Sequence, residues 1–215
     1  IAGISTGEAV QYMTSTINGF NLAATDATRV SDVFANLAAA SATDFEDLAI
    51  AVSKVSAQAN LAGMSLEYTT ALLAKGIETT QEAPESIGTA LKTIVARMRE
   101  LSSYGSVLED GASVNKVERA LASAGIELRD VNGEFRDLET IFSELGPKWD
   151  NLNTMQQQAI AQAVAGTRQQ SRLIAMMDDY ERVIELQEIS QRSAGATSAQ
   201  AATYLEGMAA SLNKV

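Results

Sequence analysis

The chain has 215 residues, 46% of them hydrophobic, which is enough for one large domain or two small ones with a substantial core. It carries 16 Lys and Arg against 27 Asp and Glu, and the resulting formal charge of −11 argues against a bare polyanion such as DNA as its partner. With neither Cys nor His, the chain has no disulfides, no thiolate or imidazole metal sites, and no Ser-His-Asp or Cys-His catalytic arrangement.

The first hundred residues read as successive amphipathic helices. One helix is predicted over residues 6–19, and a second begins after a cap at Thr25. Thr43 followed by Glu46 has the spacing of a capping box, which predicts a third helix that stops at Gly63. The apolar residues expected to face inward in the first two helices are Val10, Met13, Ile17, Val30, Val33, Phe34 and Leu37.

Ser65 is the expected cap of a fourth helix, in which Gly76 should weaken the last turns. Pro84 suits the first turn of a fifth helix, which has the strongest amphipathic pattern of the chain and extends to Leu101. Residues 103–113 lose the helical period and contain two glycines, which predicts a loop and an internal boundary.

The second half combines helices with one strand signal. A short helix over 114–124 should close at Gly125, and Asn132-Gly133 between apolar residues predicts a small β-hairpin. The helix that starts at Leu138 should be broken or kinked at Gly146-Pro147. Thr154 is the expected cap of the next helix, which ends at Gly166. Further helices are predicted over residues 168–190 and 198–212, with a linker at 193–197.

The predicted fold class is therefore all-α, a bundle of eight to ten helices with at most one small β-hairpin near Asn132-Gly133. Residues 1–102 form an N-terminal helical half, residues 103–113 a loop, and residues 114–215 a C-terminal half with the hairpin; a single continuous domain is the alternative. Because the chain opens at Ile1 without a signal-peptide pattern, we expect it to be a fragment of a much longer polypeptide. No run of about 18 apolar residues marks a membrane span.

Four short stretches are candidates for chemistry, and each has a stronger structural interpretation. Asp130 to Gly133 resembles part of a calcium loop, but its Gly stands at the fourth position rather than the sixth, so a turn is favoured. The acidic stretch from Asp178 to Glu188 can face a metal ion or a basic partner. Exposed i,i+4 ion pairs of Asp178 with Arg182 and of Glu188 with Arg192 are the favoured interpretation.

The other two stretches contain the Arg pair and the single Trp. Gly166-Thr167-Arg168 with Arg172 can hold an anion at a helix N-terminus, although the full phosphate-loop motif is missing. We favour a structural role in which Thr167 caps the helix and the arginines bond neighbouring helices. Trp149, between Lys148 and Asp150, is either a binding anchor or a core residue, and we favour the core.

Five motifs between Gly125 and Leu205 resemble, in order and spacing, the core region of the tail tape measure proteins of long-tailed bacteriophages and prophages. They are Gly125-Ile126-x-Leu128-Arg129-Asp130, Gly133-Glu134-Phe135-Arg136-Asp137-Leu138, Leu145-x-x-Lys148-Trp149-x-x-Leu152, Ala165-Gly166-Thr167-Arg168-Gln169-Gln170, and Ala194-Gly195-Ala196 before Tyr204-Leu205. Upstream, Ala24-Thr25, Asp44-x-x-Asp47-Leu48 and Gly63-Met64-Ser65-Leu66-Glu67 are similar to the more variable helical part of that family.

The resemblance implies a non-enzymatic structural protein of the phage tail that takes part in tail assembly and tail-length determination. It implies no catalytic, cofactor-binding or metal-binding residues and no cofactor. The expected partners are other copies of the chain and the tail tube, tail assembly chaperone and baseplate proteins. No specific nucleic acid is expected as a partner. Contact with a membrane is expected only during genome delivery. The expected location is the tail lumen of the virion, and the host cytoplasm during assembly.

Two other functions remain open at this stage. One is a membrane-active helical module that acts during genome delivery, although anionic lipid attracts Lys and Arg rather than an acidic chain. The other is an enzyme that uses two carboxylates as acid and base, which the absence of His does not exclude. Such an enzyme needs a pocket with two facing carboxylates.

Overall fold

A computed structural model describes residues 5–104, 113–195 and 197 of the chain. Within these residues there are nine α-helices and one 3-10 helix, which together account for 77% of the described part, and no strand or sheet. The helices are α1 (Thr6–Gly19), α2 (Ala27–Ala40), α3 (Phe45–Leu61), α4 (Leu66–Thr80), α5 (Pro84–Tyr104), α6 (Val114–Ala122), α7 (Leu138–Trp149), α8 (Thr154–Met177) and α9 (Tyr180–Gln191), with the 3-10 helix η1 at Ala24–Asp26. The all-α prediction is therefore confirmed.

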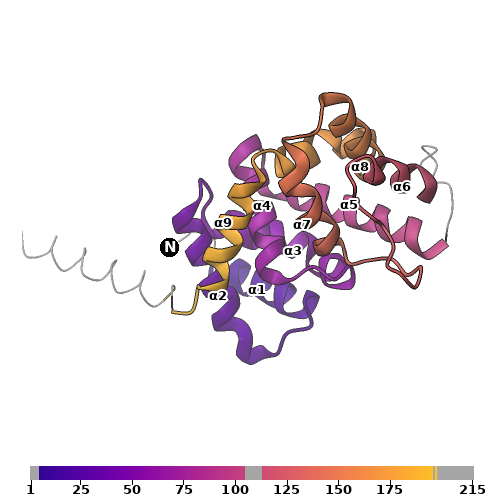
Figure 1. Cartoon of the computed structure of the whole chain (residues 1–215). Helices are drawn as coiled ribbons and strands as arrows, with labels where there is room; N and C mark the ends of the chain where they lie inside the picture. The colour runs from indigo at the N-terminus through magenta and orange to yellow at the C-terminus, as the bar shows by residue number, and fades with distance from the viewer. Residues whose placement is uncertain (1–4, 105–112, 196, 198–215) are drawn as a thin grey trace, which may run out of the picture.

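Helix α4 lies in the middle of the molecule (Figure 1). Every residue from Leu66 to Ile77 is buried, and α4 contacts α2, α3, α5, α8 and α9. Two of its buried residues are charged, and each has an ionic partner at the surface: Glu67 pairs with Arg29 at 2.6 Å, and Lys75 lies 3.7 Å from Asp179. A helix that is covered on all sides needs neighbours from distant parts of the chain, and α4 has them.

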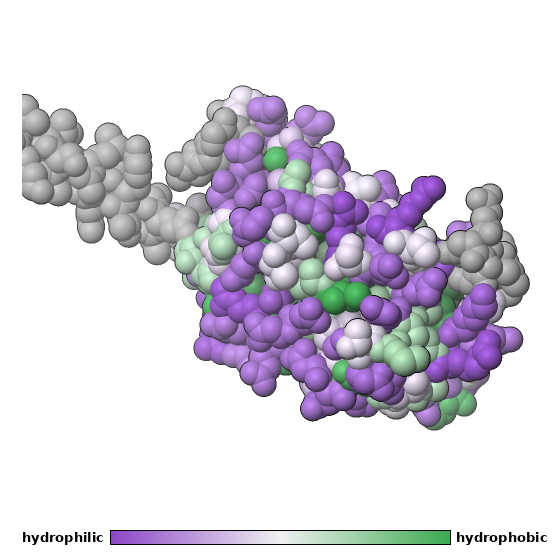
Figure 2. Space-filling model, turned by 90° about the horizontal axis from the view of Figure 1, so that it is seen from above, coloured by the Kyte–Doolittle hydropathy of each residue, from purple (hydrophilic) through white to green (hydrophobic). Residues whose placement is uncertain are grey.

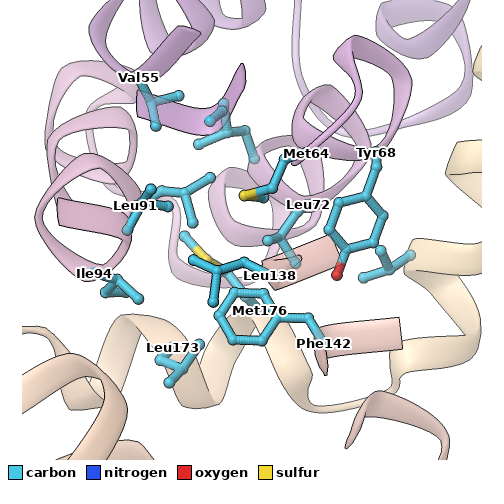
Figure 3. Packing of buried hydrophobic residues seen from close by; sticks show 14 of the residues in the cluster. Val55, Met64, Tyr68, Leu72, Leu91, Ile94, Leu138, Phe142, Leu173 and Met176 are labelled. Carbon is cyan, nitrogen blue, oxygen red and sulfur yellow. The ribbon is translucent and has the colours of Figure 1, made fainter. Parts of the chain in front are cut away.

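One apolar cluster joins residues from both sides of the segment that separates α5 from α6. Figure 3 shows part of it, with Val55 of α3, Leu72 of α4, Leu91 of α5, Phe142 of α7 and Leu173 of α8 directed toward one another. Two members of the cluster, Tyr68 and Tyr180, join their hydroxyl groups in a buried hydrogen bond of 2.7 Å. Burial is the main cause of the raised pKa of both phenols, and it keeps them neutral.

Several predicted boundaries coincide with those of the structure. Helix α1 has the predicted bounds, Ser65 caps α4 by accepting a hydrogen bond from the Tyr68 amide, and α5 begins at Pro84. Gly63 and Gly125 follow helix ends with φ of +74° and +68°, a conformation that glycine adopts without a Cβ clash.

Three predicted caps were wrong by one residue. The capping box of α3 is formed by Asp44 and Asp47 instead of Thr43 and Glu46, and that of α8 by Asn153 and Gln156 instead of Thr154. Thr25 lies inside η1, and α2 begins after Asp26. In each case two adjacent residues are good N-caps, so the pattern alone did not decide between them.

Asp44→Ala should destabilise the protein by about 1 kcal/mol, because its carboxylate accepts the Asp47 amide hydrogen bond at 2.9 Å. Glu46→Ala is the matched control and should not destabilise. Burial and the nearby carboxylates of Asp44 and Asp47 raise the pKa of Glu46, so its charge opposes folding. Urea unfolding of both variants checks the assignment. A larger loss of stability in Glu46→Ala than in Asp44→Ala would support the capping box predicted from sequence, Thr43 with Glu46.

Two glycines that were expected to weaken or break helices lie inside them. Gly76 is buried in α4, where a Cβ would come within 3.2 Å of Met176. Helix α7 continues through Gly146-Pro147 to Trp149, so of the two predicted alternatives, a break or a kink, the break is wrong. Proline clashes with the Cβ of the residue before it, and Gly146 has none. The missing Cβ also admits the ring of Tyr180, which a side chain there would overlap.

The predicted helix over 168–190 is instead interrupted between α8 and α9. Asp178 is extended (φ −62°, ψ 134°) and Asp179 is left-handed (φ 52°), a conformation that Asp tolerates better than most residues. The Gly166 break predicted from sequence is present as a residue with φ 70° and ψ 170° inside α8.

The hairpin segment contains a turn and a single antiparallel bridge between Arg129 and Phe135. The Gly133 amide donates to the Asp130 carbonyl at 3.0 Å, and Gly133 has a φ of +84°. This is a type I turn followed by a left-handed glycine rather than a two-residue turn with two positive φ angles. The Arg129 guanidinium covers the Phe135 ring at 4.0 Å.

Two further expectations need comment. Val10, assigned to the inner stripe of α1, is 60% exposed, because α1 lies at the edge of the bundle and packs mainly on α3. The predicted helix over 198–212 and most of the predicted loop at 103–113 lie outside the described residues.

Candidate functional site

Trp149 is a core residue. Its side chain is fully buried at the end of α7, and its indole Nε1 donates a hydrogen bond of 2.6 Å to Asp178. Gln157 of α8 donates to the Trp149 carbonyl at 3.0 Å. The binding-anchor interpretation of this residue is wrong, since no part of the ring is available to a partner.

The acidic stretch is divided by the break between α8 and α9. Glu188 pairs with Arg192 at 2.8 Å as predicted, but Asp178 does not pair with Arg182. Because Asp178 is extended, the two residues are not one helical turn apart. Arg182 instead donates to the Ala40 carbonyl at 2.6 Å and to Glu185 at 2.7 Å. Arg182, within this stretch, therefore connects α9 to the end of α2.

Asp130 stabilises its own turn. Its carboxylate accepts the amide hydrogen bonds of Glu134 and Asn132, both at 2.9 Å. These bonds, that of Glu134 first, lower the pKa of Asp130. The structural interpretation of this segment holds, because Asp130 Oδ1 accepts both backbone donors and Oδ2 accepts the side-chain amide of Asn132 at 3.3 Å.

The two arginines of the Gly166 motif have different surroundings. Arg172 donates to Glu82 at 2.6 Å and to Gln169 at 2.7 Å, which fixes α8 to the start of α5. Arg168 is exposed and makes no salt bridge with the described residues. The expected structural role therefore applies to Arg172, whereas Arg168 lies in a different environment.

That environment is a long crevice between α5, α6 and α8, which we call the basic crevice. It consists of two clefts of about 740 and 950 Å³ that share Arg97 and Thr167 as lining residues. Helix α5 lines it from Thr89 to Glu100, α6 from Lys116 to Ser123, and α8 from Met155 to Gln169.

Positive charge predominates in the basic crevice, in contrast with the acidic chain as a whole. The charged residues that line it are Lys92, Arg97, Lys116, Arg119, Arg168 and Glu100. In the described part of the chain, Lys92, Arg119 and Arg168 are exposed and form no salt bridge. Arg119 donates from Nε to the Asn115 carbonyl at 3.1 Å, a bond that does not neutralise its charge.

An acidic cleft lies on the α7 side of the molecule, where Glu139, Glu144 and two hydroxyl residues of α7 line it together with Asn60 and residues 63–65. Glu139 accepts the Ser65 amide at 2.6 Å, and Glu144 is ion-paired with Arg136, which lowers its pKa. Both carboxylates come from α7 and both are engaged. This cleft does not supply the two facing carboxylates that acid and base chemistry requires.

Asp32 holds the linker that follows α9. Its buried carboxylate on α2 accepts the amides of Gly195 at 2.7 Å and Thr197 at 2.8 Å. Nearby on α2, the Asn36 amide donates to the Ile189 carbonyl at 2.9 Å. Burial raises the pKa of Asp32, but the bonds from Thr197 and Gly195 outweigh it, and the net pKa is lowered.

Replacing Asp32 by Asn should free this linker. The native pKa lies below the ordinary value of 3.8, so the stabilisation is present above pH 3.8 and is lost as the pH falls through the native pKa. The protection of the Gly195 and Thr197 amides against hydrogen exchange, relative to the intrinsic rate at the same pH, should fall in the variant at pH 7, and in the native protein only as the pH falls through the pKa of Asp32. Unchanged protection in Asp32→Asn would show that other contacts hold the linker.

The surface shown in Figure 2 is mostly hydrophilic, with small hydrophobic areas between polar ones. None of the helices in the described part is long and apolar enough to cross a membrane. A search of the same residues finds no group of three or more His, Cys, Asp or Glu placed to hold a metal ion.

Sequence reasoning singled out Arg168 but missed Lys92 and Arg119. Thr89, Lys92, Ala96 and Arg97 follow one another at spacings of three, four and one along α5, and Lys116, Arg119, Ala120 and Ser123 at spacings of three, one and three along α6 and its C-cap. These patterns place small and basic residues on one helix face. That two such faces meet beside α8 depends on packing, which the sequence does not show.

Comparison with known families gives a match over most of the chain. The model of the family described as phage-related minor tail protein matches residues 1–166, about three quarters of the chain. The match begins before α1 and ends at the Gly166 break of α8. No solved structure matches the chain.

Proposed function

Because the chain belongs to the family of phage-related minor tail proteins, we propose that it is the compact core segment of a tape measure protein. In this role it is a non-enzymatic structural component of the virion that takes part in tail assembly within the tail lumen. The motifs between Gly125 and Leu205 support the finer assignment.

The observation that carries the proposal is the way the chain folds back on itself. A single helix of the whole chain would be roughly 320 Å long at 1.5 Å per residue. The segment instead surrounds α4 with helices from both halves, so it adds little length to a longer polypeptide. We infer that tail length is set by helical rods outside this segment, and that the segment serves assembly through contacts with tail tube, chaperone or baseplate proteins or with other copies.

An in-frame deletion of residues 154–190 in the parent protein tests this role. It removes α8 and most of α9, including buried Ile160, Leu173 and Met176, and should abolish or sharply reduce tail assembly. A deletion of equal length in a flanking helical rod is the control and should leave functional but shorter tails.

Electron microscopy of tail lengths distinguishes the outcomes. Intact tails shortened by about 1.5 Å per residue in the 154–190 deletion would show that this segment is part of the ruler. Tails of normal number and length would show that it is dispensable for assembly. Either result would contradict the proposal.

A further inference from the structure

We propose that the basic crevice binds an acidic, amphipathic α-helix of a partner protein. This inference concerns a site that the tape measure assignment does not use, and it holds whether or not this segment contributes to tail length. It rests on the charge, shape and lining of the crevice.

Charge is the first argument. The chain carries an excess of 11 negative charges, yet the basic crevice is lined by five cations and one carboxylate. Elsewhere in the described chain, most arginines are neutralised by neighbouring acids, as Arg29, Arg136, Arg172 and Arg182 are. Lys92, Arg119 and Arg168 form no salt bridge with the residues that the structure describes. A partner that brings carboxylates to this face gains attraction here and is repelled by most other faces.

Shape is the second argument. In the first cleft the α8 wall extends from Met155 to Ala163, which corresponds to about 12 Å along the helix axis before the Gly166 break. In the second cleft the α5 wall extends from Thr89 to Glu100, about 16 Å. A helix of about 14 residues is long enough to extend along either wall. The two clefts adjoin at Arg97 and Thr167, which line both.

The lining is the third argument. Ala96, Ala120, Ala159 and Ala163 contribute small apolar surfaces among the cations, and Met155 at one end is 80% exposed. Alanines allow a second helix to approach closely, and a flexible Met side chain adapts to apolar partners. The crevice thus offers apolar contact along its length and positive charge at Lys92, Arg119 and Arg168.

These features favour a protein helix over a nucleic acid. Single-stranded nucleic acids stack their bases on aromatic side chains, and none of the described residues that line the crevice is aromatic. A duplex is recognised through phosphates over a broad positive surface, whereas the cations here line two adjoining clefts of a chain with a net charge of −11.

The test uses two synthetic, fluorescently labelled helices of about 14 residues, cross-linked to keep them helical. One carries Glu along one face and Leu and Ala along the other, and its twin has Gln in place of Glu. Fluorescence anisotropy with the full chain should show binding of the Glu helix and binding at least about tenfold weaker for the Gln helix, with affinity falling as salt rises.

A triple charge reversal locates the site. The variant Lys92→Glu, Arg119→Glu, Arg168→Glu should lower affinity for the Glu helix at least about tenfold. The control Lys54→Glu, Lys148→Glu, Arg192→Glu changes the net charge equally on exposed residues outside the crevice and should alter affinity less than about twofold. Thermal melting shows that both variants remain folded, since all six side chains are exposed.

Several results would overturn the proposal. These are no binding of the Glu helix by the native protein, equal binding of both helices, an equal loss in the two triple variants, or an unchanged affinity in the crevice variant. Tighter binding of a DNA duplex of about 20 base pairs, lost in the crevice variant alone, would assign the site to nucleic acid instead.

Discussion

Trp149→Ala should destabilise the protein by about 3–5 kcal/mol, the largest effect expected of any single truncation in this chain. The side chain is the largest fully buried one, and it lies where the end of α7 meets the junction of α8 and α9. Its removal leaves a cavity and deprives Asp178 of its indole donor. Urea unfolding monitored by far-UV circular dichroism measures the loss, because the variant has no Trp fluorescence.

Two further variants separate packing from hydrogen bonding at this position. Trp149→Phe keeps most of the apolar volume and should lose less unfolding free energy than Trp149→Ala. Asp178→Asn keeps an acceptor for the indole and should cost about 1 kcal/mol. An unchanged unfolding midpoint in Trp149→Ala would contradict the placement of the ring in the core.

Gly88→Ala should destabilise by about 1–3 kcal/mol, although helix propensity alone predicts a gain of about 0.5–1 kcal/mol. Gly88 lies where α5 crosses α3. A Cβ there would overlap the Ala51 carbonyl oxygen and come within 2.9 Å of the Ala51 Cα. Both neighbours are helix backbone, so the two helices must separate to make room.

Gly7→Ala is the matched control, since a Cβ at Gly7 in the first turn of α1 meets only the Ser5 hydroxyl at 4.0 Å. It should be neutral or stabilise by up to about 1 kcal/mol. Differential scanning calorimetry of the two variants gives the signs directly. A gain of stability in Gly88→Ala would mean that α3 and α5 pack less closely than described.

The success of the sequence prediction differed between kinds of feature. Helix α1 and the start of α5 were predictable, because their apolar period, Gly19 and Pro84 are local signals. The continuity of α7 through Pro147 was not, because it depends on Tyr180, which fills the space beside Gly146 from another helix. The break at Asp178-Asp179 was missed for a related reason: Trp149, 29 positions earlier in the chain, bonds Asp178.

The candidate site shows the same division. The Gly166 motif directed attention to Arg168 and Arg172, yet only the fold shows that Arg172 is held by Glu82 and that Arg168 faces the basic crevice. Asp32 gave no sequence signal, because its partners Gly195 and Thr197 lie more than 160 residues away. Residue types predict what a side chain can do, and long-range packing decides whether it is free to do it.

The central position of α4 has a consequence for synthesis on the ribosome. Its covers include α8 and α9, and α9 ends at Gln191, more than 100 residues after α4 ends at Thr80. At ordinary rates of translation, on the order of 10 s passes between the two. Throughout that time Leu66, Leu72, Leu73 and Ile77 lack part of their final surroundings. The newly made chain therefore exposes apolar side chains of α4 until α9 has left the ribosome. The time needed to translate the chain from α4 to α9 should therefore affect the yield of folded protein.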